Sequence, residues 1–167
     1  MTRTPRRRAR EFALQGLYQW QLTGADAAEV ARNLAELEGY AGADEAFLKA
    51  ELAGVIGRAD ELRALLAPLA DRKWEEVSPV EKAVLLMGAW ELSSLPDLPY
   101  RVAINEAIEL AKRYGGTDGH RYVNGILDRV AQAARPEEVA AGRTGVKKGA
   151  QAGRAARPAT TPRKARA

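Results

Sequence analysis

The chain has no cysteine and only one histidine, and these two scarcities exclude whole classes of site. Without cysteine, neither a disulfide framework nor a thiolate metal site can form. His120 alone cannot build a histidine-based zinc cluster, so we interpret it as an ordinary residue at the start of a helix. The sequence therefore predicts no metal site.

Long apolar runs and catalytic patterns are missing as well. No stretch approaches the roughly 20 apolar residues that cross a bilayer. Glu11 follows the basic N-terminus at the point where a secretory signal would turn apolar. The sequence shows no nucleophile beside a base, no carboxylate pair suited to a cleft and no glycine-rich phosphate loop. We expect a cytoplasmic protein that is not an enzyme, needs no cofactor and does not bind membranes.

Acidic residues are absent from both ends of the chain. Residues 1–10 hold five arginines, residues 139–167 hold eight lysines and arginines, and all 22 acidic residues lie between Glu11 and Glu138. That middle part keeps 13 of the 26 basic residues, so it is strongly negative although the whole chain has a net charge of +4. A polyanion is repelled by such a body and attracted by its ends. The pattern indicates nucleic acid at a localised site and a separate acidic surface for a basic partner.

Apolar positions recur with a helical period across residues 11–135, which are rich in alanine, leucine and glutamate. Ser78-Pro79-Val80-Glu81 is a complete capping box, in which Ser78 accepts from the Glu81 N–H and the Glu81 carboxylate returns to the Ser78 N–H. Thr117 or Asp118 is expected to cap the last helix after a Gly-Gly break. These patterns predict an all-α bundle of about six to seven helices.

The chain divides into three parts by composition. Residues 1–10 form a basic arm leading into the first helix, and residues 11–136 form the helical domain. Residues 137–167 contain few aliphatic side chains and no aromatic one. Such a segment buries too little apolar area to offset its ordering entropy, so we predict a disordered basic tail.

Four segments of the chain carry a family resemblance when taken together. They are the arginine-rich start from Arg6 to Trp20, the block Ser78–Leu85, the block Pro99–Lys112 and the block Tyr122–Asp128. These segments resemble the NusB family of bacterial transcription antitermination factors. The resemblance covers about residues 5–135, and the blocks are specific when taken together. It implies two packed helical subdomains and binding of single-stranded boxA RNA together with NusE, a small-subunit ribosomal protein. It also implies assembly into antitermination complexes on RNA polymerase, and it allows a homodimer.

The residues that we expect to bind RNA come from the arm and from the turn near residue 118. On a helix, Arg7, Leu14 and Tyr18 share one stripe, which would combine phosphate contacts with base stacking. The resemblance implies that the arm and the turn meet in one site. The predicted set is Arg3, Arg6, Arg7, Arg8, Arg10, Gln15, Tyr18, Lys112, Arg113, Asp118, Arg121 and Tyr122. The alternatives are a solvated basic terminus, a half-buried Tyr18, and a capped helix after a Gly-Gly turn.

An acidic patch at Glu75, Glu76 and Glu81 is the candidate surface for NusE, by resemblance. Capping and the helix dipole explain the same residues without a partner. Two other functions remain open. One is the RNA-targeting domain of a ribosomal RNA cytosine methyltransferase that lacks its catalytic domain, and the other is a helical scaffold that binds only protein.

Overall fold

The computed structural model describes residues 3–142, and the secondary structure within that range is helical, with no strand. The α-helices are α1 (Pro5–Thr23), α2 (Ala27–Ala35), α3 (Glu45–Gly57), α4 (Ala59–Leu66), α5 (Pro79–Ser94), α6 (Tyr100–Tyr114) and α7 (Gly119–Ala134). Short 3-10 turns are η1 (Tyr40–Gly42), η2 (Ala67–Leu69) and η3 (Trp74–Glu76). The prediction of an all-α fold is confirmed.

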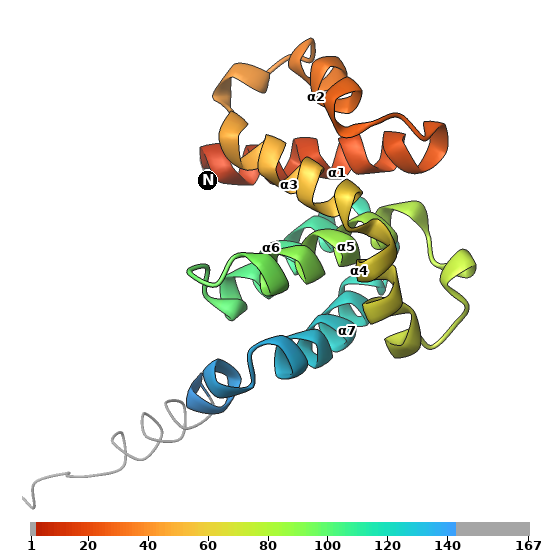
Figure 1. Cartoon of the computed structure of the whole chain (residues 1–167), viewed down its shortest axis with the longest axis vertical. Coiled ribbons are helices and arrows are strands. Elements are labelled where there is room, and N and C mark those ends of the chain that lie inside the picture. Colours follow the sequence, from red (N-terminus) through yellow and green to blue (C-terminus); the bar gives the residue numbers. More distant parts are fainter. Residues whose placement is uncertain (1–2, 143–167) are drawn as a thin grey trace, which may run out of the picture.

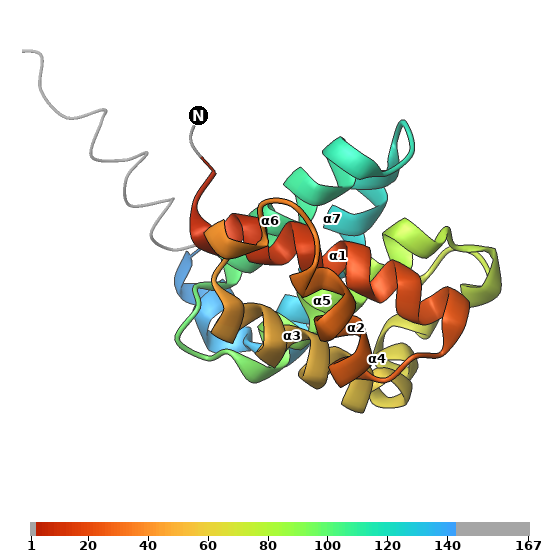
Figure 2. The same ribbon diagram turned by 90° about the horizontal axis from the view of Figure 1, so that it is seen from above.

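The helices form two groups that share one central helix. In the first group α1, α2 and α3 pack on one another, and in the second α5 packs with α4, α6 and α7 (Figure 1). Helix α5 also contacts α1 and α3, and α1 lies across it when the molecule is seen from above (Figure 2). The expected two packed helical subdomains are thus present, with α5 joining them.

Helix α5 carries apolar residues around most of its circumference, which explains its central position. Residues 83–92 are buried without exception. Gly88 lets α7 approach closely, because a Cβ at that position would lie 2.6 Å from Leu127 Cδ1. Two acidic side chains, Glu81 and Glu91, are buried on the same helix.

Polar caps set the start of several helices. Ser78 Oγ accepts from the Glu81 N–H at 3.2 Å, as predicted, but the Ser78 hydroxyl, rather than its backbone N–H, donates to Glu81 Oε2 at 3.1 Å. The predicted cap of the last helix is wrong for Asp118, whose side chain makes no capping hydrogen bond to α7. None of the helices in residues 3–142 has the length and hydropathy needed to cross a membrane.

The helical domain extends past residue 136. Residues 136–142 are helical, and Val139 is buried in the core. Glu138 accepts a hydrogen bond from the Tyr100 N–H at 2.9 Å, which ties this segment to the start of α6. The prediction of disorder from residue 137 is therefore wrong for residues 137–142, because one aliphatic side chain and one carboxylate suffice to dock them. Residues 143–167 of the predicted tail lie outside the described residues.

Arg135 closes the far end of α5. Its guanidinium donates to four backbone carbonyls at the end of that helix and in the following loop, and to Glu138 at 3.1 Å. The four acceptors are the carbonyl oxygens of Glu91, Leu92, Leu95 and Leu98. The carbonyls of Glu91 and Leu95 also accept the N–H groups of Leu95 and Leu98, so the arginine is a second donor there. The carbonyl of Leu92 lies in the last turn of α5, where the helix supplies no donor, and the arginine supplies one.

Candidate nucleic-acid interface

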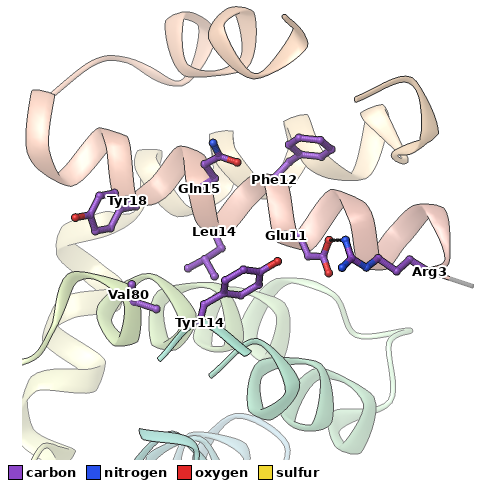
Figure 3. Close-up of a pocket in the computed structure, with 8 residues that line it drawn as sticks. All are labelled: Arg3, Glu11, Phe12, Leu14, Gln15, Tyr18, Val80 and Tyr114. Carbon is purple, nitrogen blue, oxygen red and sulfur yellow. Dashed lines mark hydrogen bonds and ion pairs between the residues drawn. The ribbon is translucent and has the colours of Figure 1, made fainter. Parts of the chain in front are cut away.

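A cavity of about 490 Å³ lies between α1 and the adjacent ends of α5 and α6 (Figure 3). Helix α1 supplies most of its wall because positions 11, 14, 15 and 18 follow one helical stripe. Val80 comes from the first turn of α5 and Tyr114 from the last residue of α6. The lining residues are Arg3, Glu11, Phe12, Leu14, Gln15, Tyr18, Val80 and Tyr114.

Two tyrosines give this cavity its aromatic character. Tyr18 is 41% exposed and Tyr114 is 43% exposed, so both rings retain surface for a ligand. Burial, together with the charge of Glu11, raises the pKa of Tyr114, so its hydroxyl keeps its proton at neutral pH. Gln15 lies on the same wall and offers an amide that can donate and accept. The surface can therefore stack a flat ring and form hydrogen bonds to its edge.

Cations collect at the end of the cavity where α1 meets α6. Glu11 binds Arg3 at 3.1 Å and Arg113 at 3.0 Å. Arg7 donates to Glu106 at 3.1 Å, and Lys112 comes from the last turn of α6. The structure thus brings together Arg3, Arg7, Lys112 and Arg113 from the predicted set, next to Gln15 and Tyr18.

Arg10 does not belong to this surface, and its assignment to RNA is corrected. Its side chain is only 3% exposed, and its Nε and Nη2 donate to Glu91 Oε1 at 3.0 and 2.5 Å. Glu106 lies 3.9 Å from Arg10 Nη1. Arg10 occupies the same helical stripe as Leu14 and Leu17, so it faces the core and neutralises buried acids there.

Arg6 and Arg8 point away from the cavity. The Arg6 guanidinium lies over the Phe47 ring of α3, 4.7 Å from its centroid. The Arg8 guanidinium rests against Gly42 of η1, where an added Cβ would lie 2.5 Å from Nη1. The arm therefore presents its arginines on two sides, and only one side adjoins Tyr18 and Tyr114.

The turn between α6 and α7 contributes fewer residues to the cavity than the sequence predicts. Tyr122 does not line the cavity. The Arg72 guanidinium lies 4.6 Å from the centroid of the Tyr122 ring, and the Tyr122 hydroxyl is buried without a hydrogen-bond partner. Asp118 and Arg121 are exposed at the start of α7. The predicted meeting of arm and turn is realised by Arg113 and Tyr114, before the turn, rather than by Tyr122.

Glu81, in the first turn of α5, packs against this turn at Gly119. It is 9% exposed, and its carboxylate packs closely on Gly119, where an added Cβ would lie 2.3 Å from Glu81 Oε1 and force a shift. The expectation that Glu81 contacts a protein partner is corrected, since the carboxylate is enclosed by its own chain. Glu75 and Glu76 are exposed, and Glu75 binds Arg63 at 2.5 Å.

Sequence reasoning missed Tyr114 and the cavity walls Phe12 and Val80. A signal for Tyr114 existed, because an aromatic residue there directly follows Lys112 and Arg113 and precedes two glycines. Phe12 and Val80 carry no such signal. Within residues 3–142, no group of three histidine, cysteine, aspartate or glutamate side chains could hold a metal ion.

Comparison with known proteins places these features in a family. The profile of the NusB family matches residues 7–132. The transcription antitermination protein NusB of Thiobacillus denitrificans is 52% identical over 134 residues, which cover 80% of this chain and 92% of that protein. The protein of the same name from Dechloromonas aromatica is 52% identical over 139 residues, covering 83% of this chain and 85% of that protein.

Solved structures agree on the fold. NusB of T. maritima superposes with a TM-score of 0.72 at 29% identity, over 83% of this chain and 99% of that chain. A NusB chain from a complex with NusE and double-stranded RNA superposes with a TM-score of 0.67 at 21% identity, over 76% of this chain and 96% of that chain. The second likeness carries the fold alone.

Proposed function

Because the chain belongs to the NusB family, we propose that it is a transcription antitermination factor that binds single-stranded boxA-type RNA together with NusE. One observation carries the RNA site: four cations border a cavity lined by two half-exposed tyrosines, on a body that is otherwise acidic. A polyanion finds attraction there and repulsion over most of the remaining surface.

The contacts divide by chemistry. Arg3, Arg7, Lys112 and Arg113 contact phosphates, because guanidinium and ammonium groups bind phosphate oxygens with charge-assisted hydrogen bonds. Tyr18 and Tyr114 stack on bases, and Gln15 bonds a base edge. The other predicted residues lie outside the two hollows, so only a longer RNA would reach them; they are Arg6, Arg8, Asp118, Arg121 and Tyr122.

A salt titration tests the phosphate contacts. Arg113→Ala should weaken binding of a boxA-like RNA and of a scrambled RNA, and should flatten the log–log salt dependence by about 0.7 per lost phosphate contact. Arg32→Ala is the matched control, since Arg32 is exposed on α2 away from the cavity and carries the same charge. Equal slopes for the two variants would place the RNA elsewhere.

Aromatic substitutions test the stacking contacts. Tyr18→Ala and Tyr114→Ala should each weaken RNA binding by roughly 1–3 kcal/mol with the salt slope unchanged. Circular dichroism verifies that both variants fold, which their exposure favours. Wild-type affinity in both folded variants would contradict a stacking role for this cavity.

We place NusE on the exposed acidic residues Glu75 and Glu76, whose charge suits a basic ribosomal protein. Replacing both by glutamine should lower NusE affinity and leave binding of RNA alone unchanged. The matched control replaces Glu36 and Glu38 by glutamine; both are also exposed, and the change removes the same amount of charge. An unchanged NusE affinity would move the partner surface elsewhere.

The remaining elements of the proposal follow from the family. The protein acts in the cytoplasm, within an antitermination complex on RNA polymerase, and a homodimer is a further state to test by sedimentation. The methyltransferase alternative needs a catalytic domain. The T. denitrificans relative is matched over 92% of its length, which leaves no space for such a domain in that protein and favours antitermination. The protein-only scaffold is decided by the RNA titrations.

A further inference from the structure

One carboxylate in the cavity already occupies the position of an anionic ligand. Glu11 Oε2 accepts from Arg3 Nη1 at 3.1 Å, and Glu11 Oε1 accepts from Arg113 Nη1 at 3.0 Å. Each oxygen therefore binds one guanidinium, and the two arginines come from opposite sides, one from the arm and one from the end of α6 (Figure 3 shows the Arg3 contact). A phosphate group bridges two guanidinium groups by the same pattern of two oxygens and two donors.

The surroundings of Glu11 are those of an anion site. The surface hollow on this side of α1 is lined by Arg3, Arg7, Lys112 and Arg113, and by only two carboxylates, Glu11 and Glu109. Lys112 lies 3.8 Å from Glu109, at the loose limit of an ion pair. Of these two carboxylates, only Glu11 is shared between two cations; Glu106, which binds Arg7 and Arg10, does not line the hollow. Glu11 is therefore the carboxylate that a phosphate has to replace.

The exchange is structurally easy. The side chains of Arg3 and Arg113 are 43% and 46% exposed, so their ion pairs with Glu11 are screened by solvent and weak. Neither arginine needs to leave its place to change partners. The carboxylate, on the other hand, stays on α1 whatever its partner, so its negative charge remains within a few ångströms of any phosphate bound there.

We propose that Glu11 is an internal phosphate substitute that sets the RNA affinity of this surface: it holds Arg3 and Arg113 in the free protein and competes with the RNA backbone for them. The inference rests on the proposed function, since it needs RNA to bind here. It assigns to Glu11 a role opposite to that of the arginines around it. The carboxylate weakens binding and favours release.

Removal of the charge with retention of shape tests the proposal. Glu11→Gln should bind a boxA-like RNA about fivefold more tightly than wild type, the factor expected from one unit charge about 4 Å away in a water-like medium. The salt dependence should steepen by about 0.7 in the log–log slope, because one more cationic charge becomes available to phosphate. A scrambled RNA should gain by the same factor, since phosphates carry no sequence information.

Two further variants serve as controls. Glu11→Asp keeps the charge, so it should not show the fivefold gain in affinity of Glu11→Gln. Glu38→Gln removes the same charge from an exposed position outside the cavity and should also leave affinity within about twofold. Circular dichroism and thermal unfolding are measured for all four proteins, and the salt slope is compared only among those with wild-type helicity.

The possible outcomes distinguish failure of the proposed role of Glu11 from failure of the proposed RNA-binding function. If wild type binds RNA and Glu11→Gln binds equally or more weakly with an unchanged slope, the phosphate-substitute role is refuted and RNA binding stands. If Glu11→Gln loses helicity, the RNA affinity of Glu11→Asp tests the proposal instead. A Glu11→Asp affinity well above that of wild type refutes the role of the Glu11 charge, and a wild-type affinity supports it. If neither wild type nor Glu11→Gln binds RNA, the proposed function fails and this inference fails with it.

Discussion

Arg10→Ala should destabilise the folded protein rather than remove a contact to RNA. The Arg10 side chain is 3% exposed and donates two hydrogen bonds to the equally buried Glu91, while Glu51 lies fully buried beside that pair. Truncation leaves Glu91 without its cation in a medium that solvates charge poorly. Removing one partner of a buried ion pair costs about 3–5 kcal/mol, a large part of the roughly 5–15 kcal/mol that stabilises a domain.

The loss should depend on pH with a definite sign. Burial, and then the charge of Glu91, raise the pKa of Glu51, whereas the Arg10 guanidinium lowers it, so Arg10→Ala raises this pKa further. A carboxyl group with a raised folded-state pKa binds more protons when folded, so the folded state loses stability as pH rises. The destabilisation of Arg10→Ala should therefore grow as pH rises and shrink in acid.

Urea unfolding followed by circular dichroism measures the effect. Arg7→Ala is the matched control, because Arg7 lies one turn earlier with a half-exposed side chain and an exposed pair to Glu106. That control should change stability by less than about 1 kcal/mol. The reasoning would be refuted if Arg10→Ala lost no more stability than Arg7→Ala, or if its loss did not vary with pH.

Three further substitutions test the core and the turn. Burial, and then the charge of Glu91, raise the pKa of Glu51, so the folded state favours a proton on Glu51 and its ionisation destabilises the protein as pH rises. Glu51→Gln does not titrate, so its stability relative to wild type should increase from mild acid to neutral pH in urea titrations. Arg135→Ala should lose about 2–4 kcal/mol by the same assay, because the carbonyls of Leu92 and Leu98 lose their donor and those of Glu91 and Leu95 lose their second donor. A loss below about 1 kcal/mol would show that water replaces the guanidinium. Gly119→Ala should lower the melting temperature, since its Cβ meets Glu81 Oε1 at 2.3 Å, whereas Gly125→Ala, with nothing within 4 Å, should not.

Local signals in the sequence predicted the helices well. The Ser78 cap needs only a hydroxyl and an N–H three residues later, and both lie within one short segment. Gly24 ends α1 in a left-handed conformation at φ 69°, as a glycine after the last apolar position indicates. Such features depend on neighbours along the chain, so a single sequence contains all that determines them.

Partners far apart in the sequence explain what was missed. Arg10 was assigned to RNA because it stands among other arginines, yet Glu91, which binds it, is 81 residues away. A hint was present: Arg10 falls on the stripe of Ala13 and Leu17, and an arginine facing a core needs an acid there. The sequence left Glu81 open between capping and a protein partner for the same reason, since Gly119, which packs against its carboxylate, comes from another helix.

The sharing of α5 by both helix groups has a consequence for how the molecule opens. In a bundle with two independent cores, one group of helices could unfold while the other stays folded. Here the unfolding of either group would expose one side of α5, whose residues 83–92 are all buried. Partial opening is then nearly as unfavourable as complete unfolding. Amide hydrogens of α5 should exchange with solvent only through global unfolding, at one common rate, while those of α2, which packs on α1, α3 and η1, should exchange earlier. The proposed RNA surface would then rest on a cooperative framework that stays closed when the exposed ion pairs on it change partners.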